Sequence, residues 1–155
     1  MKNILITGGS STIGRNLITF LLKKKYKIIF HINKNKIFIK GNKIKYIRSN
    51  FLILKSLQNF IKILCKQKSN IDCIIHLPSL KISFKRLEDY NWNEINNQLN
   101  IQVRSIHLII KNLIKKKKIS ENASIIILGS KSTEFNKSRG MLDYMMAKGL
   151  LKYYT

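Results

Sequence analysis

Residues 3–15, which read Asn-Ile-Leu-Ile-Thr-Gly-Gly-Ser-Ser-Thr-Ile-Gly-Arg, constrain the fold of this chain more than any other stretch. An apolar run at residues 4–6 is followed by small residues at 8–11, and an amphipathic pattern begins at Ile13. This order predicts a buried strand, a tight turn and a helix over residues 13–24. Small residues at such a turn let backbone N–H groups and the positive helix end approach a phosphate closely. The stretch therefore predicts a phosphate-binding turn.

The rest of the chain alternates between apolar runs and helical patterns. Strands are predicted at residues 26–32, 43–48, 71–77 and 123–128, and helices at 52–67 and 90–118. This alternation is typical of an α/β fold with a doubly wound parallel sheet, here of five strands. At 155 residues the chain is long enough for one core, so we expect a single domain over residues 1–155.

The charge of the chain is strongly positive, with 30 Lys and Arg against 7 Asp and Glu and a net charge of +23. Such a charge ordinarily suggests a nucleic-acid partner. However, Ile, Lys and Asn all have A/T-rich codons, so genome composition accounts for much of the lysine. Lys outnumbers Arg 25 to 5, whereas readers of phosphates and bases favour the planar guanidinium. We therefore expect weak, salt-sensitive sticking and no specific nucleic-acid binding.

The cysteines and histidines form no pattern of a disulfide or metal site. Cys65 and Cys73 lie in apolar surroundings, which predicts core thiols in a reducing compartment. The three histidines are far apart and lack ligand spacing, so no metal is expected. The chain enters a strand at once, and no apolar run approaches the roughly 18 residues of a membrane span. We expect a cytoplasmic protein.

The segment that follows the predicted strand 26–32 indicates which nucleotide the turn would bind. In dinucleotide-binding folds an Asp or Glu at this point bonds the 2′-hydroxyl of the adenosine ribose. The first carboxylate of this chain is Asp72, far beyond the segment. Polar and basic residues stand there instead, namely His31, Asn33, Lys34 and Lys36, with Arg15 just past the first turn. A cationic pocket suits a 2′-phosphate and favours NADP over NAD, the alternative being an ordinary lysine-rich loop.

Tyr144 and Lys148 are the candidates for chemistry. Four residues apart on a helix, they would share one face. A free phenol has a pKa of about 10, and a neighbouring ammonium favours the phenolate. Tyr144 could then exchange a proton with a carbonyl oxygen as hydride moves to or from a nicotinamide. Ser130, at the end of the predicted strand 123–128, would hold the same oxygen by a hydrogen bond.

These motifs resemble those of the short-chain dehydrogenase/reductase family, and the resemblance spans essentially the whole chain. The cofactor turn of that family, T-G-x-x-x-G-x-G, is matched at Thr7, Gly8 and Gly14. It departs at Thr12, where the family usually has glycine, so a β-branched side chain would stand beside the cofactor. The resemblance implies a Rossmann-like sheet and an NAD(P) cofactor. It also implies an oxidoreductase that acts on a small carbonyl or alcohol substrate.

The resemblance also assigns roles to individual residues. Tyr144 would be the acid/base of the Y-x-x-x-K motif, and Lys148 would also hold the nicotinamide ribose. Ser130, with Ser132 as the alternative, would be the family's serine. Asn100 would order a proton-relaying water, which completes the catalytic set. The family also places a polar and an apolar residue against the adenine, and here these are Asn50 and Phe51. The residues expected to bind the cofactor are Thr7, Gly8, Ser10, Ser11, Thr12, Ile13, Gly14, Arg15, Asn33, Lys34, Asn50, Phe51, Tyr144 and Lys148.

Two alternatives to a reductase stay open. The predicted strand 71–77 ends in His76 and Leu77 rather than in the Asn-Asn-Ala-Gly of the single-domain branch, and this ending resembles the branch of nucleotide-sugar epimerases and dehydratases. Thr12 and Pro78 also allow a catalytically dead nucleotide-binding or scaffold protein. Family members continue past the helix of Tyr144, so the chain is expected to be truncated there. Helices 91–116 and 141–154 are the candidate contacts of a homo-oligomer.

Overall fold

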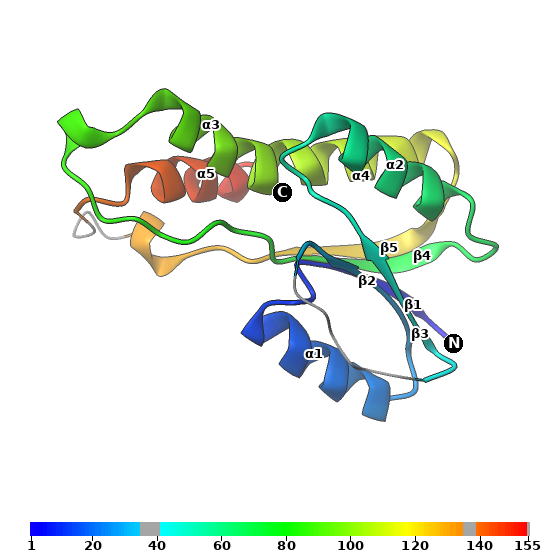
Figure 1. Ribbon diagram of the computed structural model, residues 1–155. Coiled ribbons are helices and arrows are strands. Elements are labelled where there is room, and N and C mark those ends of the chain that lie inside the picture. The colour runs from blue at the N-terminus through cyan, green and yellow to red at the C-terminus, as the bar shows by residue number, and fades with distance from the viewer. Residues whose placement is uncertain (35–40, 135–138, 155) are drawn as a thin grey trace.

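The centre of the molecule is a sheet of parallel strands. The computed structural model describes residues 1–34, 41–134 and 139–154. Within these ranges five parallel strands are arranged in the order β3-β2-β1-β4-β5 (Figure 1). The strands are β1 (Asn3–Thr7), β2 (Lys27–Ile32), β3 (Ile44–Arg48), β4 (Ile71–His76) and β5 (Ile119–Ile127). From β1 the chain adds β2 and β3 on one side and then β4 and β5 on the other, so the direction of the strand order switches between β1 and β4. In such sheets, ligands bind beyond the carboxyl ends of the strands at this switch point.

Helices cover both faces of this sheet, which confirms the predicted doubly wound, Rossmann-like fold. One face carries α1 (Thr12–Lys23), and the other carries α2, α3, α4 and α5 (Figure 1). These four helices are α2 (Leu54–Cys65), α3 (Trp92–Leu99), α4 (Ser105–Lys115) and α5 (Leu142–Lys152). Three short turns complete the described elements: η1 (Leu87–Asp89), the π-helical η2 (Asn100–Arg104) and η3 (Lys131–Thr133).

The pleat of the central strand divides the core into two clusters. Ile4 and Ile6 pack with Ile18 of α1 on one face, whereas Leu5 packs with Leu57 of α2 on the other. All five side chains are buried. A parallel strand buried on both faces needs a continuous apolar run, and this requirement is the reason that the run at residues 4–6 was a sound signal for a strand.

Two elements differ most from their predictions, whereas the other predicted strands and helices agree with the structure to within one or two residues at each end. The strand predicted at 123–128 is β5, which begins earlier, at Ile119, and includes polar residues. It lies at one edge of the sheet, where polar side chains are tolerated, and Ser120 Oγ donates a hydrogen bond of 2.6 Å to Asp72 Oδ1. The helix predicted over 90–118 runs from Trp92 to Lys115 but is widened at η2, where the Ser105 amide bonds the carbonyl of Asn100.

The two cysteines are free thiols at the margins of the core. Cys65 packs against the cluster around α2, and Cys73 packs against the cluster around α1. Both are half-buried, so they are less enclosed than the sequence predicts. Burial raises the pKa of both thiols above the ordinary value, which keeps them protonated near neutral pH.

His76, at the carboxyl end of β4, joins three elements through its ring. Its Nδ1 accepts a hydrogen bond of 2.7 Å from the hydroxyl of Thr7 in β1. Its Nε2–H donates to the carbonyl of Gln102 in η2 over 2.8 Å. The bond therefore ties the ring to the backbone of the π-helical turn itself. His76 therefore fixes the widened helix against the central strands.

His31, at the end of β2, is bonded in a similar way. Its Nδ1 accepts from the amide of Gly8 at 3.2 Å, and its Nε2–H donates to the carbonyl of Ser49 at 2.8 Å. The ring is stacked on Phe51, with 3.8 Å between centroids. Burial lowers the pKa of His31 to about 4 and that of His76 to about 3. Both rings are therefore neutral at physiological pH.

The neutral histidines predict that the fold loses stability as the pH falls from 6.5 to 5. In the unfolded chain a histidine takes up its proton at about pH 6.5, whereas the pKa values of His31 and His76 in the fold are about 4 and 3. In this window the unfolded state binds more protons, so the free energy of unfolding decreases by up to about 1.4 kcal/mol per pH unit for each histidine. Denaturant titrations at successive pH values measure the slope. His76→Gln should reduce it, whereas His107→Gln, at an exposed position, should not. Equal slopes in the wild type and His76→Gln would contradict this explanation.

Candidate functional site

The region where β1 passes into α1 has room only for glycine at three positions. A Cβ on Gly9 would lie 2.8 Å from Cδ2 of the buried Phe30. Gly8 has a positive φ of 74°, and a Cβ on it would lie 2.9 Å from the backbone nitrogen of Pro78. A Cβ on Gly14 would lie 2.6 Å from the carbonyl oxygen of Gly8. The turn is therefore pressed against both the end of β4 and the first turn of α1. This contact leaves no space for a side chain at Gly8.

The amino end of α1 faces the same region. Ser11 is the N-cap of the helix, and its hydroxyl accepts a hydrogen bond of 3.0 Å from the amide of Gly14. Other amides of a first helical turn have no partner within the helix, and this end of a helix carries positive partial charge. Thr12, the first helical residue, is exposed and has no left-handed backbone strain. An anion is the ligand that such an end attracts.

The turn forms one wall of a cleft of about 470 Å³ at the carboxyl ends of the strands. Tyr144 and Lys148 of α5, which lie near the other end of the sequence, line the same cleft. The remaining wall comes from the end of β2, from the segment that follows β4, from one residue of η2 and from Leu128, which follows β5. In chain order the lining residues are Gly8, Ser10, Ser11, Ile13, His31, Asn33, Leu77, Pro78, Ser79, Leu80, Ile82, Ile101, Leu128, Tyr144 and Lys148.

Lys148 is unusual among the lysines because its side chain is only 3% exposed. Its Nζ donates a hydrogen bond of 2.6 Å to the carbonyl of Leu128 and lies 5.6 Å from the ring centroid of Tyr144. Burial disfavours the charged form and lowers the pKa of Lys148 to about 8. The side chain of Lys148 is therefore mostly protonated at pH 7, so a positive charge lies beside the phenol ring of Tyr144.

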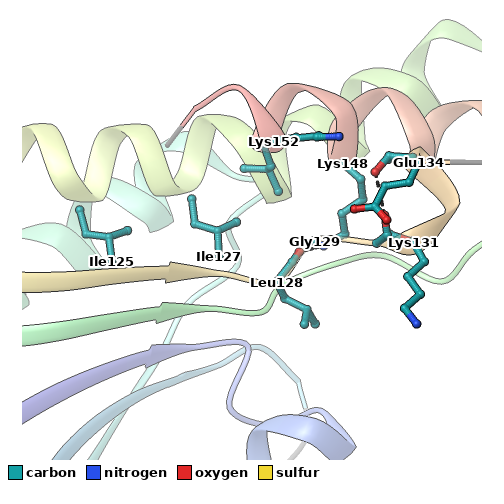
Figure 2. A pocket seen from close by; sticks show the side chains of 11 residues that line it. Ile125, Ile127, Leu128, Gly129, Lys131, Glu134, Lys148 and Lys152 are labelled. Atoms are coloured by element: carbon teal, nitrogen blue, oxygen red, sulfur yellow. Dashed lines mark hydrogen bonds between the residues drawn. The ribbon is translucent and has the colours of Figure 1, made fainter.

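Ser130 lines an adjoining groove of about 620 Å³, shown in Figure 2. Lys148 reaches down from α5 toward Gly129 there, and Leu128 points away from Ile127 to the other side of β5 (Figure 2). Leu128 and Lys148 line both the groove and the cleft, so the two spaces meet at these residues. Ser130 Oγ accepts the amide of Ser132 at 3.3 Å, a bond that does not use the hydroxyl hydrogen.

Several of the expected site residues have their side chains elsewhere. Thr7 is fully buried, and its hydroxyl is bonded to His76. Phe51 is 1% exposed and packs on the ring of His31. Asn50 Oδ1 accepts the amide of Leu52 at 3.1 Å. Asn100 opens the π-helical turn and does not line the cleft.

The expected 2′-phosphate pocket is only partly described. Asn33 lines the cleft, whereas Lys34 and Arg15 are exposed, and Lys36 falls outside the described residues. His31 does not belong to a cationic pocket, because burial keeps its ring neutral. The charged residues of the expected pocket that the structure describes are Lys34 and Arg15, and neither of them lines the cleft.

The sequence analysis did not identify the wall formed by residues 77–82 as part of the site. Leu77, Pro78, Ser79, Leu80 and Ile82 all line the cleft. A signal for this wall was present, because these residues follow a predicted parallel strand and ligands bind where such strands end. Ser79 adds a hydroxyl to the cleft, and the side-chain amide of Gln102 donates to it at 3.4 Å.

The described part of the chain has neither a metal-binding cluster nor a membrane-spanning helix. Residues 1–34, 41–134 and 139–154 contain no group of three or more His, Cys, Asp or Glu side chains placed to hold a metal ion. In the same ranges, no helix has both the length and the apolar character needed to cross a membrane.

Solved structures with the same fold are numerous. A short chain dehydrogenase family protein of Francisella tularensis matches with a TM-score of 0.87 and 24% identity, over 100% of this chain and 61% of that one. A short chain dehydrogenase of Leptospira borgpetersenii with bound NAD⁺ matches with a TM-score of 0.85 and 21% identity, over 99% of this chain and 63% of that one. A blue fluorescent protein from a metagenomic library, in complex with NADPH, matches with a TM-score of 0.85 and 19% identity, over 99% of this chain and 66% of that one.

These identities establish a shared fold, and the chain spans less than two thirds of the Francisella protein. No curated protein matched the sequence. The family model described as short chain dehydrogenase matches residues 2–155, which is nearly the whole sequence. The chain therefore belongs to the short-chain dehydrogenase family of oxidoreductases.

Proposed function

We propose that this chain, as one nucleotide-binding domain over residues 1–155, transfers hydride between NADP(H) and a small carbonyl or alcohol substrate. The observation that supports this proposal is the single cleft lined by both Gly8 and Tyr144. A turn that attracts phosphate and a phenol beside an ammonium are the two ends of the site that such a reaction needs. The chain spans 61% of its Francisella neighbour, so the activity is proposed for the site and not carried over from that protein.

The residues of the cleft fit a dinucleotide. The closeness of Gly8 to Pro78 leaves no space for a side chain at this point of the turn, so a pyrophosphate could approach the backbone there. We infer that Gly8, Ser10, Ser11, Ile13 and the exposed Thr12 surround the pyrophosphate, and that Lys148 holds the ribose next to the nicotinamide. Gly14 would serve by packing, since it is buried beneath the turn. Bound there, the nicotinamide would supply or accept the hydride.

The protein would supply the proton. Tyr144 would donate its phenolic proton to the carbonyl oxygen in reduction and would accept it in oxidation. The ammonium nitrogen of Lys148 lies 5.6 Å from the ring centroid, so a positive charge stands beside the ring when the phenol gives up its proton. Ser130 would donate its hydroxyl hydrogen to the same oxygen, and Asn100 would act through an ordered water from η2.

The preference for NADP rests on charge. An NAD-binding site of this architecture places a carboxylate near the end of the second strand, and this chain has none before Asp72. Lys34 follows β2 closely and is exposed, Arg15 is exposed on the first turn of α1, and Asn33 lines the cleft. Structural neighbours with NAD⁺ and with NADPH both exist, so the fold itself accommodates either nucleotide. Asn50 and Phe51 would contribute to the adenine side through their backbone, since the Phe51 side chain is buried.

We also propose a cytoplasmic location for this chain.

We further propose that copies of the chain assemble through the outer helices. Three large apolar side chains on these helices are more than half exposed, namely Trp92 of α3, Ile114 of α4 and Leu150 of α5. Exposed apolar side chains on neighbouring helices suit contact with a second copy of the chain. The surfaces involved are the predicted ranges 91–116 and 141–154.

The first test is nucleotide choice. In fluorescence titrations at about 0.15 M salt, which screens non-specific attraction, NADPH should bind about tenfold more tightly than NADH, because charged hydrogen bonds to the 2′-phosphate are gained. Lys34→Met should reduce this ratio, whereas Lys23→Met, at the far end of α1, should not. Gly8→Val should abolish binding of both nucleotides. Equal affinity for NADH would contradict the choice of NADP, and binding of neither would contradict the proposed function.

The second test is the role of the phenol. Tyr144→Phe should reduce kcat at least about 100-fold, the usual contribution of a proton donor, and should leave the Kd of NADPH within about twofold, because the ring is retained. Tyr46→Phe, on an exposed tyrosine of β3, is the matched control. If Tyr144→Phe instead lost nucleotide affinity and kept kcat, the tyrosine would be structural.

The third test uses the lowered pKa of Lys148. Because this pKa is about 8, the side chain becomes neutral as the pH rises above 8. NADPH affinity should therefore decrease above pH 8, by up to about tenfold per pH unit. Lys148→Met should bind NADPH weakly and without this step, and Lys131→Met, an exposed lysine of the same groove, should keep it. An unchanged pH dependence in Lys148→Met would contradict contact between this lysine and the nucleotide.

A further inference from the structure

The amino end of α5, the helix that carries Tyr144 and Lys148, has no side-chain cap of its own. Met141 is the N-cap residue, and its apolar side chain makes no capping hydrogen bond. Asp143 is the acidic residue of the first turn, but its buried Oδ1 has no hydrogen-bond partner among the described residues. The first amide of the helix, that of Leu142, therefore depends on a group from elsewhere in the chain.

That group is the hydroxyl of Tyr90, more than fifty residues earlier. Its oxygen accepts a hydrogen bond of 3.1 Å from the amide of Leu142. The same hydroxyl donates to the carbonyl of Gly140 over 2.5 Å, and the carbonyl of Ser83 lies 3.2 Å away. The carbonyl of Gly140 accepts a second bond, of 2.9 Å, from the amide of Lys85. One phenol thus holds the backbone on both sides of the start of α5.

The ring of Tyr90 is itself held at a well-ordered helix start. Asn91, the next residue, is the N-cap of α3, and Glu94 completes a capping box with it. Glu94 also accepts a hydrogen bond of 2.6 Å from Lys85, whose Nζ lies 6.0 Å from the centroid of the Tyr90 ring. These contacts fix Tyr90 relative to α3, so the position of α3 determines where α5 begins.

The turn that leads into α5 needs this support. Gly140 has a positive φ of 78°, and a Cβ on it would lie 3.0 Å from the carbonyl oxygen of Lys85. The backbone segments around Lys85 and Gly140 therefore lie in direct contact. Tyr144 follows Leu142 by two residues and Lys148 follows by six, less than two helical turns away. A rotation or fraying of the first turn would move the phenol first.

We propose that Tyr90 is a positioning residue that caps α5 from outside and thereby sets the direction of the Tyr144 phenol in the cleft. Its contribution to the reaction rests on the proposed function, whereas its hydrogen bonds do not. Tyr90 touches neither the cleft nor the groove, so it takes no part in binding the nucleotide.

Amide hydrogen exchange of the full chain, measured by NMR, tests the cap directly. The first amide of a helix ordinarily exchanges freely, but that of Leu142 should be protected in the wild type. Tyr90→Phe, which removes only the hydroxyl, should speed its exchange about tenfold, the value of one hydrogen bond. The amide of Met145, which bonds the carbonyl of Met141, should keep its protection in the variant. Unchanged exchange at Leu142, or loss of protection at Met145 as well, would overturn the proposal.

Kinetics separate positioning from stability. Tyr90→Phe should lower kcat about tenfold and leave the Kd of NADPH unchanged, because only the phenol end of the cleft is disturbed. Tyr46→Phe should change neither. Faster exchange at Leu142 with unchanged kcat would show a cap that does not position Tyr144, which also overturns the proposal. If the wild type transfers no hydride, the proposed function fails, while the exchange of Leu142 still decides whether Tyr90 caps α5.

Discussion

The close contact between the first turn and the end of β4 is the constraint on which the cleft depends. The backbone of Gly8 approaches that of Pro78 so closely that a Cβ would lie 2.9 Å from its nitrogen. Bonds on either side secure this approach, since the Thr7 hydroxyl reaches His76 and the Gly8 amide reaches His31. Because both rings stay neutral at physiological pH, the turn adds no charge of its own beyond the dipole of α1. The result is a backbone surface at the switch point of the sheet, where an anion can be bound.

The opposite end of the cleft is defined by a buried charge. Removing an ammonium from water is unfavourable, and the single carbonyl of Leu128 compensates for only part of this cost. A phenolate or the phosphates of a nucleotide would compensate for more. The lowered pKa of Lys148 is therefore what a lysine prepared for an anionic partner should show, and this is our reason for assigning it to the nucleotide and to Tyr144.

The fold could be predicted from the sequence because the spacing of apolar residues follows which side chains are buried. The continuous apolar run of β1 reports a strand that is covered on both faces. The helical spacing of residues 13–24 reports a helix with one face on the sheet, although that face contains Ile18 and Leu21 and the side chain of Ile13 is exposed. Family membership, suggested by the order of Gly8, Ser130 and Tyr144, is confirmed over residues 2–155. The four-residue spacing of Tyr144 and Lys148 also predicted that one helix face carries both, and both residues line the cleft.

The parts that could not be predicted depend on contacts that no local pattern records. His31 stands among basic residues in the sequence, which suggested a charged pocket. In the structure it is a core residue whose ring stacks on Phe51, a contact that the sequence does not record. The π-helical turn at Asn100–Arg104 lies within one continuous stretch of helical pattern, and nothing in that pattern marks it. Tyr90 contacts a turn about fifty residues away, and its sequence neighbours give no hint of that contact.

The central claim is that one nucleotide lies across the cleft from the first turn to the phenol of α5. The most direct measurement is a two-dimensional ¹H–¹⁵N NMR titration of the full chain with NADPH at about physiological salt. The account predicts that the amides of Gly8 and Ile13 shift together with those of Tyr144 and Lys148, with one common Kd. Shifts confined to exposed lysines, with Gly8 and Tyr144 unmoved, would show attraction to the charge of the protein and would contradict the account.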